Sequence, residues 1–305
     1  MMLIGTGVIW GTIGIATKYL FRESDLDAVS VSWLRAAIAG LICIALGWRA
    51  LGGRLFAITK RDFAIMALLG VILIVYQFFY AAALERIGIS ATTLISLCGA
   101  PVLVVIASNV FLHVRLSRRG GMALVGSLIG TVMLVGWQSG GTGETRDTVI
   151  GVALSVASAA GVATHVFVSR LIAGRHHFTR PLAIGFPAGA LFFAPVAFGH
   201  GVSLDLSGTA WALILYLAIG PSTIAYLMYQ RGLQDVTATD ASIVTLLEPL
   251  VTAILAAFLF DERLGLLGWL GALLLVGSIA VLTLSPNSDD SRYAAPLLAT
   301  GEPIS

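Results

Sequence analysis

Charged residues are scarce in this sequence. They make up 11% of the 305 residues, whereas hydrophobic residues make up 58%. A soluble globular domain carries about 25% charged residues, so water is excluded as the solvent for most of this protein's surface. The net charge of +2 is small and the basic residues are dispersed, which argues against nucleic acid as a partner. The composition indicates a protein whose main partner is the lipid bilayer.

Cysteines and enzyme motifs are scarce as well. Cys43 and Cys98 are the only cysteines and both lie in apolar runs, so neither a disulfide framework nor a metal site is expected. The sequence contains no His-Glu-x-x-His motif and no Gly-x-x-x-x-Gly-Lys-Ser/Thr motif, which are typical of zinc proteases and of P-loop ATPases. No cofactor and no enzymatic activity are therefore expected.

Long apolar runs are what the sequence has instead. A membrane-spanning helix needs about 20 mostly apolar residues. Runs of that length cover residues 3–21, 29–48, 62–84, 89–112, 118–137, 149–171, 181–199, 209–229, 238–260 and 265–284. The sequence thus predicts an all-α membrane protein with ten transmembrane helices. The polar segment 286–305 is predicted to be a disordered C-terminal tail.

Basic residues favour one set of helix ends. Twelve of them share this set, namely Arg49, Arg54, Lys60, Arg61, Arg115, Arg118, Arg119, Arg170, Arg175, Arg180, Arg231 and Arg292. The opposite ends carry four, namely Arg22, Arg86, Arg146 and Arg263. Since basic residues concentrate in cytoplasmic loops, the N and C termini are both predicted to be cytoplasmic.

The sequence also resembles itself at a separation of about 148 residues, the separation of Pro101 and Pro249. The segment from Gly14 to Lys18 similarly matches the segment from Gly161 to His165. Each half then contains five predicted helices, in residues 1–140 and 149–285. Two copies of an odd-numbered unit enter the membrane from opposite sides, and such inverted repeats are typical of secondary transporters.

Several prolines interrupt the predicted helices and are candidate hinges. They are Pro101, Pro187, Pro195, Pro221 and Pro249. Because Pro101 and Pro249 occupy matched positions in the two halves, we predict that the moving gates of the transporter lie there.

Short motifs resemble those of a known family. They are Trp10-Gly11, Leu34-Arg35, Glu248-Pro249 and the run from Leu259 to Leu264. Over essentially its whole length the chain resembles the EamA type of the drug/metabolite transporter superfamily, and within it is most similar to the bacterial aromatic amino acid exporters. The resemblance implies a central cavity lined by helices 3–21, 62–84, 89–112, 149–171, 209–229 and 238–260, with helices 118–137 and 265–284 at the periphery.

Polar and aromatic residues concentrate on the helices that would line this cavity. The predicted substrate-binding residues are Trp10, Tyr76, Tyr80, Thr92, Ser96, Gly99, His165, Tyr226, Tyr229, Ser242, Thr245 and Glu248. Their helical spacing puts Thr92, Ser96 and Gly99 on one helix face. Tyr226 and Tyr229 have an alternative role as anchors at the membrane interface, where tyrosine is enriched.

Two of these residues are ionisable and lie deep in the predicted membrane. A carboxylate such as Glu248 costs about 2.5–3.5 kcal/mol at the centre of a helix. Glu248 is predicted to contact a substrate amine, to serve a proton-linked gate, or to bond the backbone freed by Pro249. His165 is predicted to line the cavity, where it binds substrate, responds to protons or joins two helices. Proton coupling and passive facilitation both remain open.

Lys18 and Arg35 are the two basic residues inside predicted spans, toward the outer ends of their helices. One interpretation is that they extend to the interface and pair with the acidic loop between the two helices. The other is an outer gate or a site that attracts a carboxylate. For the deeper Arg35 a structural role is favoured and gating is the second hypothesis, and both residues are candidates for the gate.

The predicted function is a secondary transporter that exports amino acids, aromatic or large neutral, or similar small metabolites by alternating access. The predicted location is the bacterial inner membrane, crossed many times, and a monomer is compatible with the sequence. One alternative is an exporter or exchanger of another metabolite or drug-like compound in the same superfamily. A membrane-embedded enzyme is disfavoured because no Ser/His/Asp arrangement lies on neighbouring helices.

Overall fold

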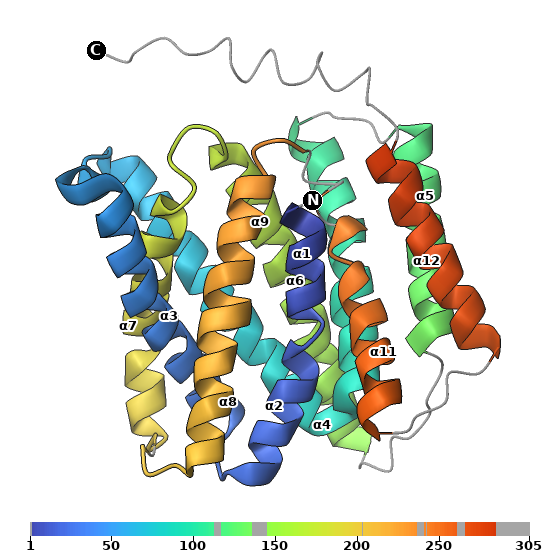
Figure 1. Cartoon of the computed structure of the whole chain (residues 1–305), viewed down its shortest axis with the longest axis horizontal. Coiled ribbons are helices and arrows are strands. Elements are labelled where there is room, and N and C mark those ends of the chain that lie inside the picture. Colours follow the sequence, from blue (N-terminus) through green and yellow to red (C-terminus); the bar gives the residue numbers. More distant parts are fainter. Residues whose placement is uncertain are drawn as a thin grey trace.

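The computed structural model describes residues 2–112, 117–135, 145–202, 204–236, 241, 243–260 and 266–284. All regular structure in these residues is helical. The helices run roughly alongside one another in a bundle (Figure 1). They are α1 Met2–Trp10, α2 Ile13–Glu23, α3 Ala28–Leu51, η1 Gly52–Phe56, α4 Lys60–Leu112, α5 Arg118–Val135, α6 Thr145–Ile172, α7 Arg180–Gly199, α8 Gly208–Ile219, η2 Gly220–Ala225, α9 Tyr226–Gly232, α11 Leu247–Phe260 and α12 Leu266–Leu284.

In the part of the chain that the structure describes, six helical segments are long and apolar enough to cross a membrane. They are Met2–Glu23, Ala28–Phe56, Lys60–Gly88, Arg146–Arg170, Arg180–Gly199 and Gly208–Gly232. Shorter apolar helices cover Ile95–Ala107 and Leu266–Ser278. The chain is therefore a multi-pass helical membrane protein. The exact number of ten spans stays a prediction, and the predicted tail 286–305 lies outside the described residues.

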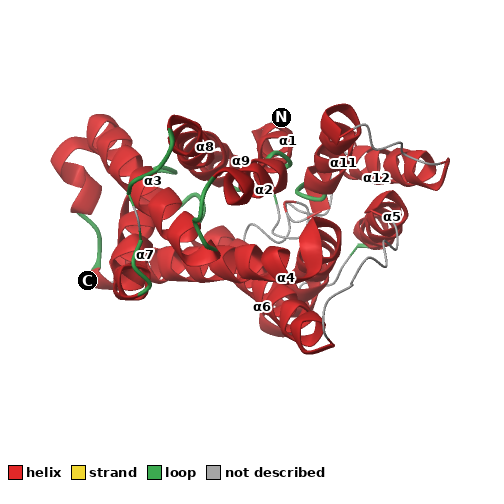
Figure 2. Cartoon of the chain, turned by 90° about the horizontal axis from the view of Figure 1, so that it is seen from below, coloured by secondary structure: helices red, strands yellow, loops and turns green. Residues whose placement is uncertain are grey.

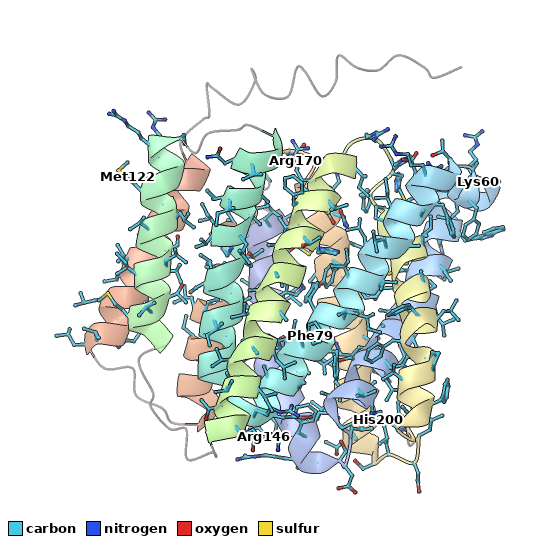
Figure 3. All side chains as sticks on the ribbon, turned by 180° about the vertical axis from the view of Figure 1, so that it is seen from behind. Lys60, Phe79, Met122, Arg146, Arg170 and His200 are labelled. Carbon is cyan, nitrogen blue, oxygen red and sulfur yellow. The ribbon has the colours of Figure 1, made fainter. Side chains whose placement is uncertain are left out.

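The helix ends divide into two groups. Lys60, Met122 and Arg170 lie at one end of the bundle, and Arg146 and His200 lie at the other (Figure 3). Of these residues, Lys60 and Arg170 were assigned to one set of helix ends and Arg146 to the other. Which end faces the cytoplasm stays a prediction, since the grouping alone does not assign a side.

Three of the predicted apolar runs are broken in the residues that the structure describes, two of them beside a proline already expected to interrupt its helix. The run 3–21 is divided at Gly11 and Thr12, between α1 and α2. The run 209–229 passes through η2, a π-helical turn that contains Pro221. Because proline has no N–H to donate, the hydrogen-bond pattern changes at this point. A turn at residues 245–246 precedes α11, so Pro249 lies in the first turn of that helix, where proline is tolerated.

Within α4, Gly88 separates two helical arms. Its φ of 77° and ψ of 172° are not helical, and a positive φ of this kind is readily adopted by glycine. Predicted helices 62–84 and 89–112 are therefore two arms that meet at Gly88, and Pro101 lies inside the second arm.

The helices of the bundle centre pack closely where glycines meet. Helix α4 packs against α6 and α7, and α3 packs against α7. At the α4–α7 contact, Gly70 lies directly against the backbone of Gly185 and Gly189. Small residues of this kind allow two helix backbones to approach in a membrane.

Helices α5 and α12 form the edge of the molecule, as the resemblance implied. They pack mainly against each other (Figure 2). Large apolar side chains on both helices are exposed, among them Met122, Val125, Leu273 and Val281. Such a surface suits contact with lipid chains.

Candidate substrate-binding site

An aromatic cluster lies where α1, α4 and α9 meet. The Trp10 ring packs against Tyr226 and Tyr229, with ring centroids 4.8 Å and 5.3 Å apart. The hydroxyl group of Tyr226 is hydrogen-bonded to that of Tyr76 on α4. Four predicted substrate-binding residues from distant parts of the sequence are thus brought together.

His165 joins this cluster from α6. Its ring lies edge-on to Tyr76 and Tyr226, with centroids 6.0 Å and 5.9 Å apart, and the residue is buried. Phe186 of α7 also meets Tyr226 edge-on, at 5.7 Å. Sequence reasoning missed Phe186 because one phenylalanine in an apolar helix carries no distinguishing pattern.

The interpretation of Tyr226 and Tyr229 as interface anchors is wrong. An anchor needs its hydroxyl group in the wet interfacial region, but Tyr226 is 4% exposed and Tyr229 is 1% exposed. Both side chains instead fill the space between Trp10 and the neighbouring helices. Their position is internal, as expected of residues that line a substrate path.

Side chains of α1 and α11 satisfy the backbone groups released by the helix breaks. The Trp10 Nε1–H donates to the carbonyl oxygen of Pro221 at 3.1 Å. The Thr6 hydroxyl donates to the carbonyl oxygen of Ala225 at 3.2 Å, and the Thr252 hydroxyl donates to that of Gly11 at 2.7 Å. Buried carbonyl groups require such partners. The breaks are therefore built features of the bundle centre.

Two ionisable side chains lie next to the aromatic cluster. Arg35 of α3 is buried and donates to the Ser222 hydroxyl through Nε at 3.3 Å and Nη2 at 3.1 Å. Glu248, at the start of α11, is also buried. The Glu248 carbonyl oxygen lies against Gly11, the residue after Trp10.

The structural role considered for the Glu248 side chain is not found. In a regular helix the N–H of residue 249 would donate to the carbonyl oxygen of Thr245, but proline has no N–H. That carbonyl oxygen instead accepts a hydrogen bond from the Glu248 backbone N–H at 3.0 Å. The Glu248 carboxylate is not needed to satisfy that carbonyl group. Bonding to the freed backbone therefore does not explain why the Glu248 side chain lies here.

Several predicted residues of the second α4 arm face α6 instead of the cluster. The Ser96 hydroxyl donates to the carbonyl oxygen of Ser155 at 3.1 Å. Gly99 lies beside Ala159, and Thr92 is fully buried. Helix packing accounts for this face in the conformation described here. Ser242 lies outside the described residues.

Tyr80 and Thr245 occupy the borders of the cluster. The Tyr80 hydroxyl is hydrogen-bonded to the Thr93 hydroxyl at 2.9 Å, and this bond joins the two arms of α4. Thr245 is half-buried in the turn before α11.

The two ends of the bundle differ. An open cavity of about 500 Å³ lies at the end that holds Lys18, lined also by Arg22, Asp25, Asp27 and Glu85. Among the residues that the structure describes, no three His, Cys, Asp or Glu side chains are grouped as a metal site requires. Because basic and acidic side chains both line this cavity, we call it the charged vestibule.

At the other end of the bundle, the segments that connect the helices contact one another. Arg180 Nη2 donates to the carbonyl oxygen of Arg54 at 2.7 Å. His176 Nε2 lies 3.3 Å from Asp62 Oδ2. These contacts join the segment after α3 to the segment after α6, at the end opposite the vestibule.

Comparison with known proteins agrees with a helical membrane protein. The model of the EamA-like transporter family matches residues 1–136 and again residues 149–284. The chain belongs to the EamA-like transporter family, and it is a membrane transporter.

Relatives over nearly the whole length are also transporters by name. The chain is 27% identical over 301 residues to an uncharacterized inner membrane transporter, YicL, of Salmonella typhimurium, covering 94% of each chain. It is 23% identical to an uncharacterized transporter, YwfM, of Bacillus subtilis, again covering 94% of each. One solved crystal structure has a TM-score of 0.76 and 24% identity, covering 93% of this chain and 96% of that one. This last likeness shows the fold.

Proposed function

We propose that this transporter exports amino acids, aromatic or large neutral, across the bacterial inner membrane. The observation that carries the proposal is the cluster of Trp10, Tyr76, His165, Tyr226 and Tyr229. Aromatic faces and edges attract other aromatic rings. A cluster with polar tips suits a small molecule that has both an apolar ring and polar groups.

The cluster draws on both halves of the chain, which supports transport by alternating access. Trp10 and Tyr76 belong to the first matched segment, and His165, Tyr226 and Tyr229 belong to the second. We infer that the halves are inverted five-helix repeats, with both termini in the cytoplasm and the substrate between them. In that arrangement the charged vestibule faces outward and the Arg180–Arg54 contact lies on the cytoplasmic side.

Transport in proteoliposomes tests the proposal. The purified protein would be reconstituted and uptake of radiolabelled phenylalanine, tryptophan and leucine would be measured with and without a pH gradient. We expect saturable uptake and counterflow, which distinguish a carrier from a channel. Absence of flux for every amino acid under every gradient would contradict amino acid transport.

The same assay tests proton coupling. Glu248→Gln removes the carboxylate with little change in volume, and Glu23→Gln is the matched control because Glu23 is exposed. If Glu248 carries the coupled proton, the variant loses the response to the pH gradient, while counterflow is still measurable at higher substrate concentration. An unchanged gradient response in Glu248→Gln would assign the coupling elsewhere or indicate passive facilitation.

A further inference from the structure

Arg35 has hydrogen-bonding capacity that the protein does not use. It is 6% exposed, and its guanidinium donates through Nε and Nη2 to a single neutral oxygen, the Ser222 hydroxyl. In the described part of the chain Nη1 has no hydrogen-bond partner and no carboxylate forms a direct ion pair with Arg35. A buried cation held by one hydroxyl is costly unless another group compensates it.

Glu248 is an acidic residue with the same incomplete pairing. It is 9% exposed. Its backbone N–H bonds to Thr245 and its carbonyl oxygen accepts from Thr252 at 3.0 Å, but its carboxylate has no hydrogen bond to any described residue. Carboxylates inside a membrane are expensive and usually functional. The Glu248 carboxyl group thus has no hydrogen-bond donor among the described residues.

The two groups lie on elements that meet at Trp10 and Gly11. Arg35 donates to Ser222, next to the Pro221 carbonyl group that Trp10 bonds, and η2 leads directly into Tyr226. On the other side, the Glu248 carbonyl oxygen lies against Gly11. The Arg35 guanidinium and the Glu248 carboxyl group therefore lie beside the aromatic cluster without pairing with each other. This arrangement is complementary to a molecule with a carboxylate, an ammonium group and an aromatic side chain.

We propose that Arg35 binds the carboxylate of the substrate and that Glu248 binds its ammonium group. Arginine presents paired N–H groups that match a carboxylate, and Nη1 is free for this role in the residues described. The substrate class is then zwitterionic α-amino acids, with preference over amines that lack the carboxylate and acids that lack the amine. The inference rests on the proposed function and assigns Arg35 a binding role, where sequence reasoning had favoured a structural role with gating as the second hypothesis.

Competition with phenylalanine analogues tests the assignment. Inhibition constants against labelled phenylalanine counterflow would be measured for phenylalanine, phenylalaninamide, which lacks the carboxylate, and 3-phenylpropionate, which lacks the amine. A charge-assisted hydrogen bond contributes about 1.5–3 kcal/mol, which corresponds to about tenfold or more in affinity. We therefore expect both analogues to bind wild-type protein at least about tenfold more weakly than phenylalanine.

The variants then separate the two subsites. Arg35→Gln is expected to weaken phenylalanine and 3-phenylpropionate by about tenfold while phenylalaninamide changes less than about twofold. Glu248→Gln is expected to weaken phenylalanine and phenylalaninamide while 3-phenylpropionate is unchanged. Arg61→Gln and Glu23→Gln are matched controls, since both residues are exposed, and neither is expected to alter any of the three constants.

Each result decides the question. Equal weakening of all three ligands by Arg35→Gln would overturn the assignment and indicate a structural role for the Arg35–Ser222 contact. If Arg35→Gln does not fold, Arg35→Lys keeps the charge without the paired N–H groups and is expected to weaken only the two carboxylate ligands. If wild-type protein shows no saturable phenylalanine flux, the proposed function itself fails, which is distinct from a wild type that transports phenylalanine with variants that do not discriminate.

Discussion

The indole N–H of Trp10 donates a hydrogen bond to the carbonyl oxygen of Pro221 at 3.1 Å and so joins the end of α1 to the π-helical turn η2. The two residues are 211 positions apart in the sequence. The same indole ring packs against Tyr226 and Tyr229. One side chain therefore both satisfies a break in a helix and forms part of the candidate site.

Replacing Trp10 with phenylalanine separates these two roles. Trp10→Phe keeps an aromatic ring and removes the donor to Pro221, and a hydrogen bond of this kind contributes about 0.5–1.5 kcal/mol. We expect a lower midpoint of thermal unfolding in detergent. Trp269→Phe is the control, because Trp269 is exposed on α12. Equal midpoints for the two variants would show that the Trp10–Pro221 bond does not contribute to stability.

The hydroxyl pair of Tyr76 and Tyr226 should behave as a coupled unit. Either phenylalanine variant removes the bond that joins α4 to α9, so the double variant should lose little more than each single one. The expected coupling energy is about 0.5–1.5 kcal/mol in a double-mutant cycle of unfolding free energies. Tyr80 bonds to Thr93 instead, so Tyr80→Phe combined with Tyr226→Phe should be additive. Additivity for Tyr76 and Tyr226 would contradict the pairing.

The Thr252–Gly11 bond can be tested against a matched threonine. Thr252 donates to Gly11 and also to the preceding turn of its own helix, whereas Thr164 of α6 makes only the bond within its helix, to Ala160 at 2.8 Å. Thr252→Val leaves the buried Gly11 carbonyl group without this donor, which costs about 1–3 kcal/mol. Thr164→Val is expected to change unfolding free energy by less than about 0.5 kcal/mol. Indistinguishable variants would show that another group replaces the donor at Gly11.

The glycine contact between α4 and α7 should be intolerant of a methyl group. A Cβ atom at Gly70 would overlap the carbonyl group of Gly185, so Gly70→Ala must separate the helices. Overpacking of this kind costs about 1–3 kcal/mol, and a reduced yield of folded protein is expected in size-exclusion chromatography. Gly277 of α12 has nothing within 4 Å of that position. Gly277→Ala should be neutral or stabilising by about 0.5–1 kcal/mol, and the reverse order would refute this packing.

Much of the fold followed from hydropathy, because the cost of placing polar residues in lipid makes apolar runs long and recognisable. The peripheral position of α5 and α12 was predicted from helices that are apolar on every side. The break at Gly11 was not predicted. A hydropathy profile measures transfer of side chains to lipid, and it contains no information about which backbone carbonyl groups Thr252 or Trp10 satisfies.

The site was predictable where single residues are expensive in a membrane. Trp10, Tyr76 and His165 were predicted as residues that line the cavity, and all three contact Tyr226 in the structure. Ser222 and Phe186 did not stand out, since serine and phenylalanine are common in such helices. Their roles arise from contacts with Arg35 and Tyr226 that only the folded chain reveals.

The π-helical turn has a geometric consequence for the rest of its helix. A π turn holds one residue more than an α turn, and one extra residue rotates everything that follows by about 100° around the helix axis. The Thr223 hydroxyl, which donates to the carbonyl oxygen of Ala218 five residues earlier at 2.8 Å, marks this insertion. The angular direction of Tyr226 and Tyr229 is thus set upstream, by the residue count between Gly220 and Ala225. A chain shortened by one residue there would keep every aromatic side chain and point both tyrosines away from Trp10.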